Sequence, residues 1–153
     1  MKLSPRDQRL MERLAAGALC RDGFLGDDQR LPDEIIRADD AAVEAMGVTH
    51  EQIADALERI CKRAAEAGGA PVHPAEGLTA VFHEAMGRIP CPWGGHGVFA
   101  KGEVEVTDEP QARTLRFTPL SIHLIREHGF YQGRGSRYRI EPTEAAELVE
   151  RGG

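Results

Sequence analysis

Residues 49–64 read THEQIADALERICKRA, and this stretch decides the fold class. Thr49 and Gln52 are spaced as a capping box, in which each side chain satisfies a free backbone N–H of the first helical turn. Apolar residues then recur at three- and four-residue steps, which predicts one buried helical face. That face carries Ile53, Leu57, Ile60, Cys61 and Ala64. The stretch therefore predicts a long amphipathic helix that stops at residues 68–69, a pair of glycines.

Two further helices are predicted on the N-terminal side of this stretch. Ser4 can accept a hydrogen bond from free backbone donors and Pro5 suits the first helical position, so a helix begins there. Its apolar face continues to Ala18. A second helix begins at Pro32 and ends near Gly47, which tolerates a left-handed cap. We therefore expect residues 1–69 to be a helical region of three helices.

The period of the apolar residues changes after the proline- and glycine-rich connection at 70–77. Alternation of apolar and polar residues predicts strands at 79–84, 97–107, 113–117 and 137–140. Thr118 caps a short helix that ends at Gly129, and Pro142 begins a closing helix. Because helices cluster before strands, the sequence predicts an α+β fold and disfavours a doubly wound parallel sheet. Residues 78–153 then form a small antiparallel sheet with a short helix and a C-terminal helix, sharing one core with the helical region.

Length and composition limit the class of protein further. The chain has 153 residues, enough for one domain, with 41% hydrophobic and 29% charged residues and a net charge of −6. It has no apolar stretch long enough for a membrane span. Its three cysteines, Cys20, Cys61 and Cys91, include no C-x-x-C pair, so we expect reduced thiols. The expectation is a cytoplasmic protein without membrane association.

Cysteine and histidine residues provide a candidate metal site. Cys91 and His96 flank a turn containing proline and glycine, and His123 and His128 follow on the predicted short helix. Zinc prefers thiolate and imidazole ligands. The order of turn, strands and helix with paired histidines resembles a Cys2His2 finger or zinc ribbon over residues 91–128, with His96 in the place of the second cysteine. A five-residue helical step rotates His128 by about 140° from His123, so we expect the last turn to relax if both bind one ion.

The number of ligands determines what such a metal does. Four protein ligands would make it a structural staple, whereas three and an open position would activate water. A metal-dependent hydrolase also needs a general base, for which Glu84, Glu103 and Glu127 are candidates. The plainer alternative is that Cys91 is a buried apolar group and the histidines cap helices or face solvent. We favour a non-enzymatic binding or regulatory module with a structural zinc site.

An arginine-rich segment at 113–139 is the alternative functional region. Residues 111–140 carry six arginines against a single glutamate. Arginine forks and glycine-rich backbone bind phosphate or carboxylate oxygens, and Tyr131 could stack on a base. This pattern predicts an anionic ligand, a phosphate compound or RNA as partner, although a solvated hairpin or a protein-binding edge has the same composition. The anion ligands would be Arg134, Ser136, Arg137 and Arg139.

Residues 42–57 have the spacing of a helix-turn-helix unit. The helix that would enter DNA carries Glu51, Asp55 and Glu58, which phosphates repel. We therefore do not expect DNA binding, and two packed helices joined by a tight turn explain the pattern.

Overall fold

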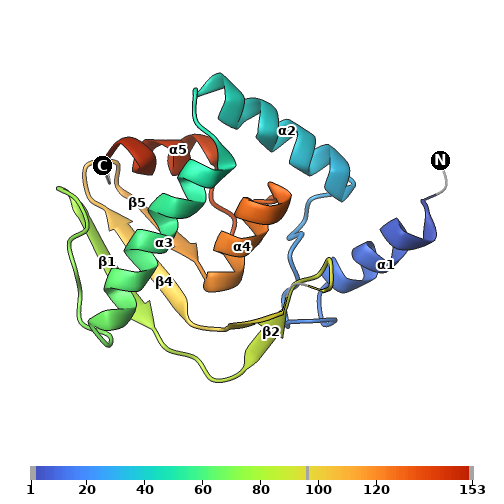
Figure 1. The fold of residues 1–153 in the computed structure, drawn as a ribbon, viewed down its shortest axis with the longest axis horizontal. Helices are drawn as coiled ribbons and strands as arrows, with labels where there is room; N and C mark the ends of the chain where they lie inside the picture. Colours follow the sequence, from blue (N-terminus) through green and yellow to red (C-terminus); the bar gives the residue numbers. More distant parts are fainter. Residues whose placement is uncertain (1–2, 96, 152–153) are drawn as a thin grey trace.

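The computed structural model describes residues 3–95 and 97–151. Its elements follow the chain in an order that places helices first, strands next and two helices last (Figure 1). They are α1 (Pro5–Leu14), α2 (Pro32–Ala45), α3 (His50–Glu66), β1 (Leu78–His83), β2 (Arg88–Pro90), β3 (Val98–Ala100), β4 (Glu103–Asp108), β5 (Arg113–Phe117), α4 (Pro119–His128) and α5 (Pro142–Arg151). The predicted α+β fold is confirmed.

The N-terminal helices begin where the capping residues place them. The Ser4 side chain accepts from the Asp7 backbone N–H at the start of α1, and Thr49 and Gln52 cap α3 reciprocally as expected. The first helix is shorter than predicted, because Ala15 adopts an extended conformation and α1 ends at Leu14. Apolar spacing alone therefore overestimated this helix by about one turn.

The main sheet has three antiparallel strands in the order β1-β4-β5. Helices α3, α4 and α5 cover one of its faces (Figure 1). The sheet residues buried under these helices are Leu78, Ala80, Val104, Val106, Leu115 and Phe117. The opposite face carries polar and charged residues, among them His83, Glu103, Glu105 and Arg116. One face of the sheet is thus core and the other is a charged surface.

A second, two-stranded sheet pairs β2 with β3. The sequence had predicted one strand at 97–107, but the chain forms β3 and β4 in different sheets. Between them lies Gly102, where a Cβ would collide with the ring of Phe82. A glycine is required there because the aromatic ring closes on the backbone. The break lets the β2–β3 pair project from the main sheet.

The last predicted strand, at 137–140, is wrong. In the structure, residues 129–141 run from α4 to α5 as an irregular connection with two turns. Ile140 is buried as the alternation required, but Arg139 turns to bind Asp39 of α2 and not to pair with a strand. A buried ion pair thus produced the same alternation as a half-buried strand.

Two apolar clusters make up the core. The larger contains residues of α2 and α3 together with residues of the main sheet, α4 and α5. The smaller lies beneath α1, where Leu10 and Leu14 pack with Phe24, Leu124 and Cys91. Among the helices that the structure describes, none is long and apolar enough to cross a membrane. The smaller cluster is where the cysteine of the candidate metal site lies.

Candidate metal centre

Helix α4 holds both histidines of the candidate centre. Thr118 and Ser121 form a reciprocal cap at its start, and Gly129 ends it with φ 62, in the left-handed region. Glycine adopts that conformation without the penalty of a Cβ. The helix therefore stops directly after His128, which places this ring at its C-terminal end.

The structure brings three of the four predicted metal ligands together. One ligand atom each of Cys91, His123 and His128 lies within 4.8 Å of the other two. The Sγ of Cys91 is 3.5 Å from Nε2 of His128. A tetrahedral zinc ion separates a sulfur from a nitrogen ligand by about 3.6 Å, given the usual metal–ligand bond lengths. The cysteine and one histidine therefore already have the spacing of zinc ligands.

The five-residue spacing of the histidines does not require the helix to unwind. The backbone N–H of Gly129 still donates to Ile125 and Leu124, so α4 is intact through His128. The two imidazole rings nevertheless lie 5.6 Å apart, at an interplanar angle of 78°. The expectation of a relaxed last turn concerns the metal-bound state and stays a prediction, but the side chains alone already bring the rings this close.

Aromatic rings hold the two imidazoles in place. The indole of Trp93 stacks on His128, with ring centroids 4.2 Å apart and planes 9° from parallel. Phe99 of β3 packs against His123 at 4.6 Å between centroids. Phe130 meets Trp93 edge to face at 5.3 Å. These contacts restrict both imidazole rings, which lowers the entropy lost when they bind an ion.

The thiol of Cys91 lies in a mixed environment. The residue is 2% exposed, and this burial raises the pKa of the thiol. The backbone N–H groups of Trp93 and Gly94 and the charge of Arg13 act in the opposite direction, because they favour the thiolate. Arg13 Nε also donates to the carbonyl of Pro92, which connects α1 to the loop. Burial is the larger effect, so a metal would have to displace a thiol proton, and these groups only partly offset the cost of forming the thiolate.

The remaining predicted participants lie elsewhere or cannot be placed. His96 falls outside the described residues. Among the described residues, the group contains no carboxylate: Glu127 is exposed on α4, and Glu84 is exposed after β1. Glu103 belongs to a different group on the open face of the main sheet. The structure thus brings none of the three candidate bases to the cysteine and histidines.

That second group consists of His83, Glu103 and Glu105. Its carboxylates are already paired with guanidinium groups: Arg137 Nε is 2.9 Å from Glu103, and Arg116 is 3.1 Å from Glu105. Positive charge beside the carboxylates opposes a cation. This group is better explained as a charged sheet surface than as a metal site.

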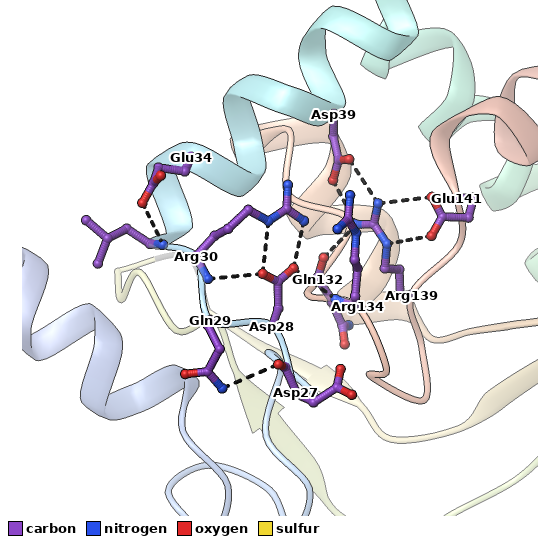
Figure 2. Close-up of polar contacts among 11 residues, drawn as sticks. Asp27, Asp28, Gln29, Arg30, Glu34, Asp39, Gln132, Arg134, Arg139 and Glu141 are labelled. Carbon is purple, nitrogen blue, oxygen red and sulfur yellow. Dashed lines mark hydrogen bonds and ion pairs between the residues drawn. The ribbon is translucent and has the colours of Figure 1, made fainter.

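The arginine-rich segment is engaged by carboxylates of this chain. Arg139 makes two hydrogen bonds to Asp39, at 2.8 and 2.9 Å, and two more to Glu141 (Figure 2). Both Arg139 and Asp39 have side chains less than a tenth exposed. These carboxylates raise the pKa of Arg139, although burial acts against this. The hydrogen-bond donors of the Arg139 guanidinium are therefore used by carboxylates within the protein.

The other predicted anion ligands also form hydrogen bonds within the chain, although Arg134 and Arg137 are exposed. Arg137 pairs with Glu103, and the Ser136 hydroxyl donates to Oε1 of Gln132 at 2.6 Å. For Arg134 the backbone N–H donates to the Asp28 carboxylate, which Arg30 also binds (Figure 2). The side chains of Ser136, Arg137 and Arg139 are thus engaged by groups of this chain, which does not favour an anion site at 134–139.

Sequence reasoning missed one feature next to the centre. Arg6, Arg9 and Arg13 follow one another along α1 and line a cleft that also includes Trp93. Their spacing of three and four residues was a visible signal of a shared helix face.

Comparison of the chain with protein-family models, curated proteins and solved structures gives no match.

Proposed function

We propose that this protein is a non-enzymatic binding or regulatory module whose C-terminal part is stapled by one zinc ion. Cys91, His123 and His128 hold the metal. The observation that carries the proposal is the convergence of one sulfur and two imidazole nitrogens within 4.8 Å, contributed by segments that are 32 residues apart at their nearest.

The donor set argues for zinc among the common ions. A thiolate with imidazoles suits zinc, whereas calcium and magnesium need oxygen ligands. His96, five residues after Cys91 in the sequence, completes the set as the fourth ligand in our proposal. Free thiols persist in a reducing compartment, so we propose a cytoplasmic location as well.

A structural role fits the surroundings better than hydrolysis does. Cys91 is buried, and both imidazoles are packed against aromatic rings. Among the described residues, no carboxylate joins the group to act as a general base. A bound ion would instead fasten the turn after β2 to α4. It would thereby fix the smaller core cluster on which α1 packs.

Metal analysis of the purified protein tests the proposal. We expect about one equivalent of zinc, and replacement by cobalt should give the charge-transfer absorption of a cobalt–thiolate bond. Cys91→Ser should abolish that absorption and lower zinc affinity. Cys61→Ser is the matched control, because Cys61 is a half-buried thiol on α3 outside the group. It should bind zinc as the wild type does.

A second pair of variants separates the two histidine groups. His128→Asn should weaken zinc binding, whereas His83→Asn on the open sheet face should not. The proposal is contradicted if the protein binds less than about a tenth of an equivalent of zinc at micromolar metal. It is equally contradicted if Cys91→Ser leaves zinc affinity unchanged.

A further inference from the structure

We propose that the cleft between α1 and Trp93 binds a mononucleotide, with its phosphate on the arginines of α1. The cleft has a volume of about 490 Å³ and is lined by side chains of α1, by Asp33 at the start of α2 and by Trp93. That volume lies within the usual range for small-molecule sites. None of its lining residues is a proposed zinc ligand, so the proposal goes beyond the metal site.

The helix presents its arginines as one row. At 100° per residue, Arg6, Arg9 and Arg13 lie within about 60° of one another on α1, and the row extends about 10 Å along the axis. Leu10 and Leu14 fasten the helix to the smaller core cluster, while Arg6 and Arg9 are exposed. The helix therefore has a buried apolar face that anchors it and a basic face that borders the cleft.

These arginines differ in their charge environment from five of the six arginines of the 113–139 segment, Arg134 being the exception. Arg113, Arg116, Arg126, Arg137 and Arg139 each form ion pairs with carboxylates of this chain. Within residues 3–95 and 97–151, no ion pair involves the three arginines of α1. Arg13 gives one donor to the Pro92 carbonyl and retains the other four of its guanidinium. Free guanidinium forks match phosphate oxygens.

The other lining residues fit the rest of a nucleotide. Trp93 presents an indole whose stacking on His128 fixes its orientation, and aromatic side chains in such positions stack on bases. Asp7 and Asp33 contribute carboxylates, which accept hydrogen bonds from ribose hydroxyls and base amino groups. Three arginines against two aspartates leave the lining net positive. Phosphate, sugar and base thus each find complementary groups.

Tryptophan fluorescence gives a direct test, because Trp93 is the single tryptophan of the chain. Titration of the full-length protein with adenosine monophosphate should quench the emission and saturate below about 1 mM. Adenosine and inorganic phosphate, each alone, should bind at least roughly tenfold more weakly, since each lacks one group of contacts. Added salt should weaken the mononucleotide as it screens the guanidinium–phosphate pairs.

An exposed arginine outside the cleft provides the control. Arg9→Gln should raise the dissociation constant for adenosine monophosphate roughly tenfold, because a charged hydrogen bond is lost. Arg63→Gln, at an exposed position on α3, should leave it unchanged. Both variants are on helix surfaces, so their circular dichroism and zinc content should match the wild type.

Four results would overturn the proposal. They are the absence of saturable quenching, equal binding of adenosine and adenosine monophosphate, equal binding of inorganic phosphate, and an unchanged dissociation constant in Arg9→Gln. An oligoribonucleotide of about twelve residues that binds at least tenfold more tightly than the mononucleotide would assign the cleft to single-stranded RNA instead. Zinc content is measured separately, so failure here is distinguishable from failure of the metal proposal.

Discussion

The Arg139 cluster and the Cys91 group bury polar side chains in opposite ways. Asp39 and Arg139 are 100 residues apart in the chain, and Glu141 completes a set of opposite charges that satisfy one another. Cys91, His123 and His128 instead direct three lone-pair donors towards one region. The first cluster contains its own counter-charges, whereas the side chains of the second are ligands of the kind that bind a metal cation.

This difference shows why a count of arginines is a poor guide to an anion site. The 113–139 segment is rich in arginine, yet five of its six guanidinium groups form ion pairs with carboxylates of this chain. The arginines of α1 are fewer and lie in a chain region of net negative charge, yet among the described residues they form no ion pair with the two carboxylates, Asp7 and Asp33, that line the same cleft. The charge that matters is the local charge after folding.

The largest expected loss of stability comes from removing a carboxylate from the Arg139 cluster. Asp39→Ala leaves Arg139 buried beside only one carboxylate, and should lower the free energy of unfolding by about 3–5 kcal/mol. Urea unfolding measures this. Asp40→Ala, which removes an exposed partner of His50, should cost less than about 1 kcal/mol. If the two variants were equally stable, the ion pair of Arg139 with Asp39 would not stabilise the fold.

Removal of the metal tests the second group, Cys91 with His123 and His128. With free zinc about a hundredfold above its dissociation constant, binding should add about 2.7 kcal/mol to the free energy of unfolding. For a domain of this size, that corresponds to a rise in Tm of about 5–10 °C. Thermal scans with zinc and with a chelator measure the shift. A shift of the same size in Cys91→Ser would show that zinc acts at another place.

Acid should weaken a second ion pair, that of Arg30 with the buried carboxylate of Asp28 (Figure 2). Hydrogen bonds from the Arg30 side chain hold the pKa of Asp28 well below its ordinary value of 3.8, against the effect of burial. A depressed pKa stabilises the fold fully above the unfolded pKa, and this contribution is lost as pH falls towards the folded pKa.

Urea midpoints between pH 6 and pH 2.5 measure that loss. The wild type should lose stability below about pH 4 more steeply than Asp28→Asn does, by at most about 1.4 kcal/mol per pH unit. Asp27→Asn, at the exposed neighbouring position, should retain the wild-type slope. Parallel pH profiles for wild type and Asp28→Asn would disprove the role of this pair.

The smallest effect is expected at the exposed end of the arginine-rich segment. Arg137→Ala removes an ion pair in which the arginine is 54% exposed, so unfolding should change by less than about 0.5 kcal/mol. Chemical denaturation resolves this. If Arg137→Ala lowered the free energy of unfolding by more than about 2 kcal/mol, this exposed ion pair would be as important as the buried one of Arg139, and the contrast between them would be lost.

The sequence predicted those elements whose signals are local. Thr49 and Gln52 are three residues apart, and the apolar face of α3 is complete within its own residues. Thr118 and Gly129 likewise limit α4. Local capping and periodicity therefore predicted the α+β order. They missed β2, because Arg88–Pro90 is only three residues long and includes a proline.

The candidate site was predictable in part for the same reason. Thiol and imidazole residues are rare enough that their chemistry proposes a ligand set, and three of these residues meet in the structure. Long-range pairing is different. No residue near Arg139 in the sequence indicates that its guanidinium binds Asp39, which is 100 residues away in the chain. Such a pairing depends on the completed packing of α2 against α5 and the preceding connection.

Helix α5 gives this architecture a temporal order. Its Ala145 and Leu148 fill the larger core cluster, and the helix contacts both α2 and α3. A nascent chain must therefore wait for residues 142–151 to leave the ribosome before α2 and α3 have their final neighbours. Until then α2 and α3 present unfilled apolar surface, on which chaperones would bind during synthesis.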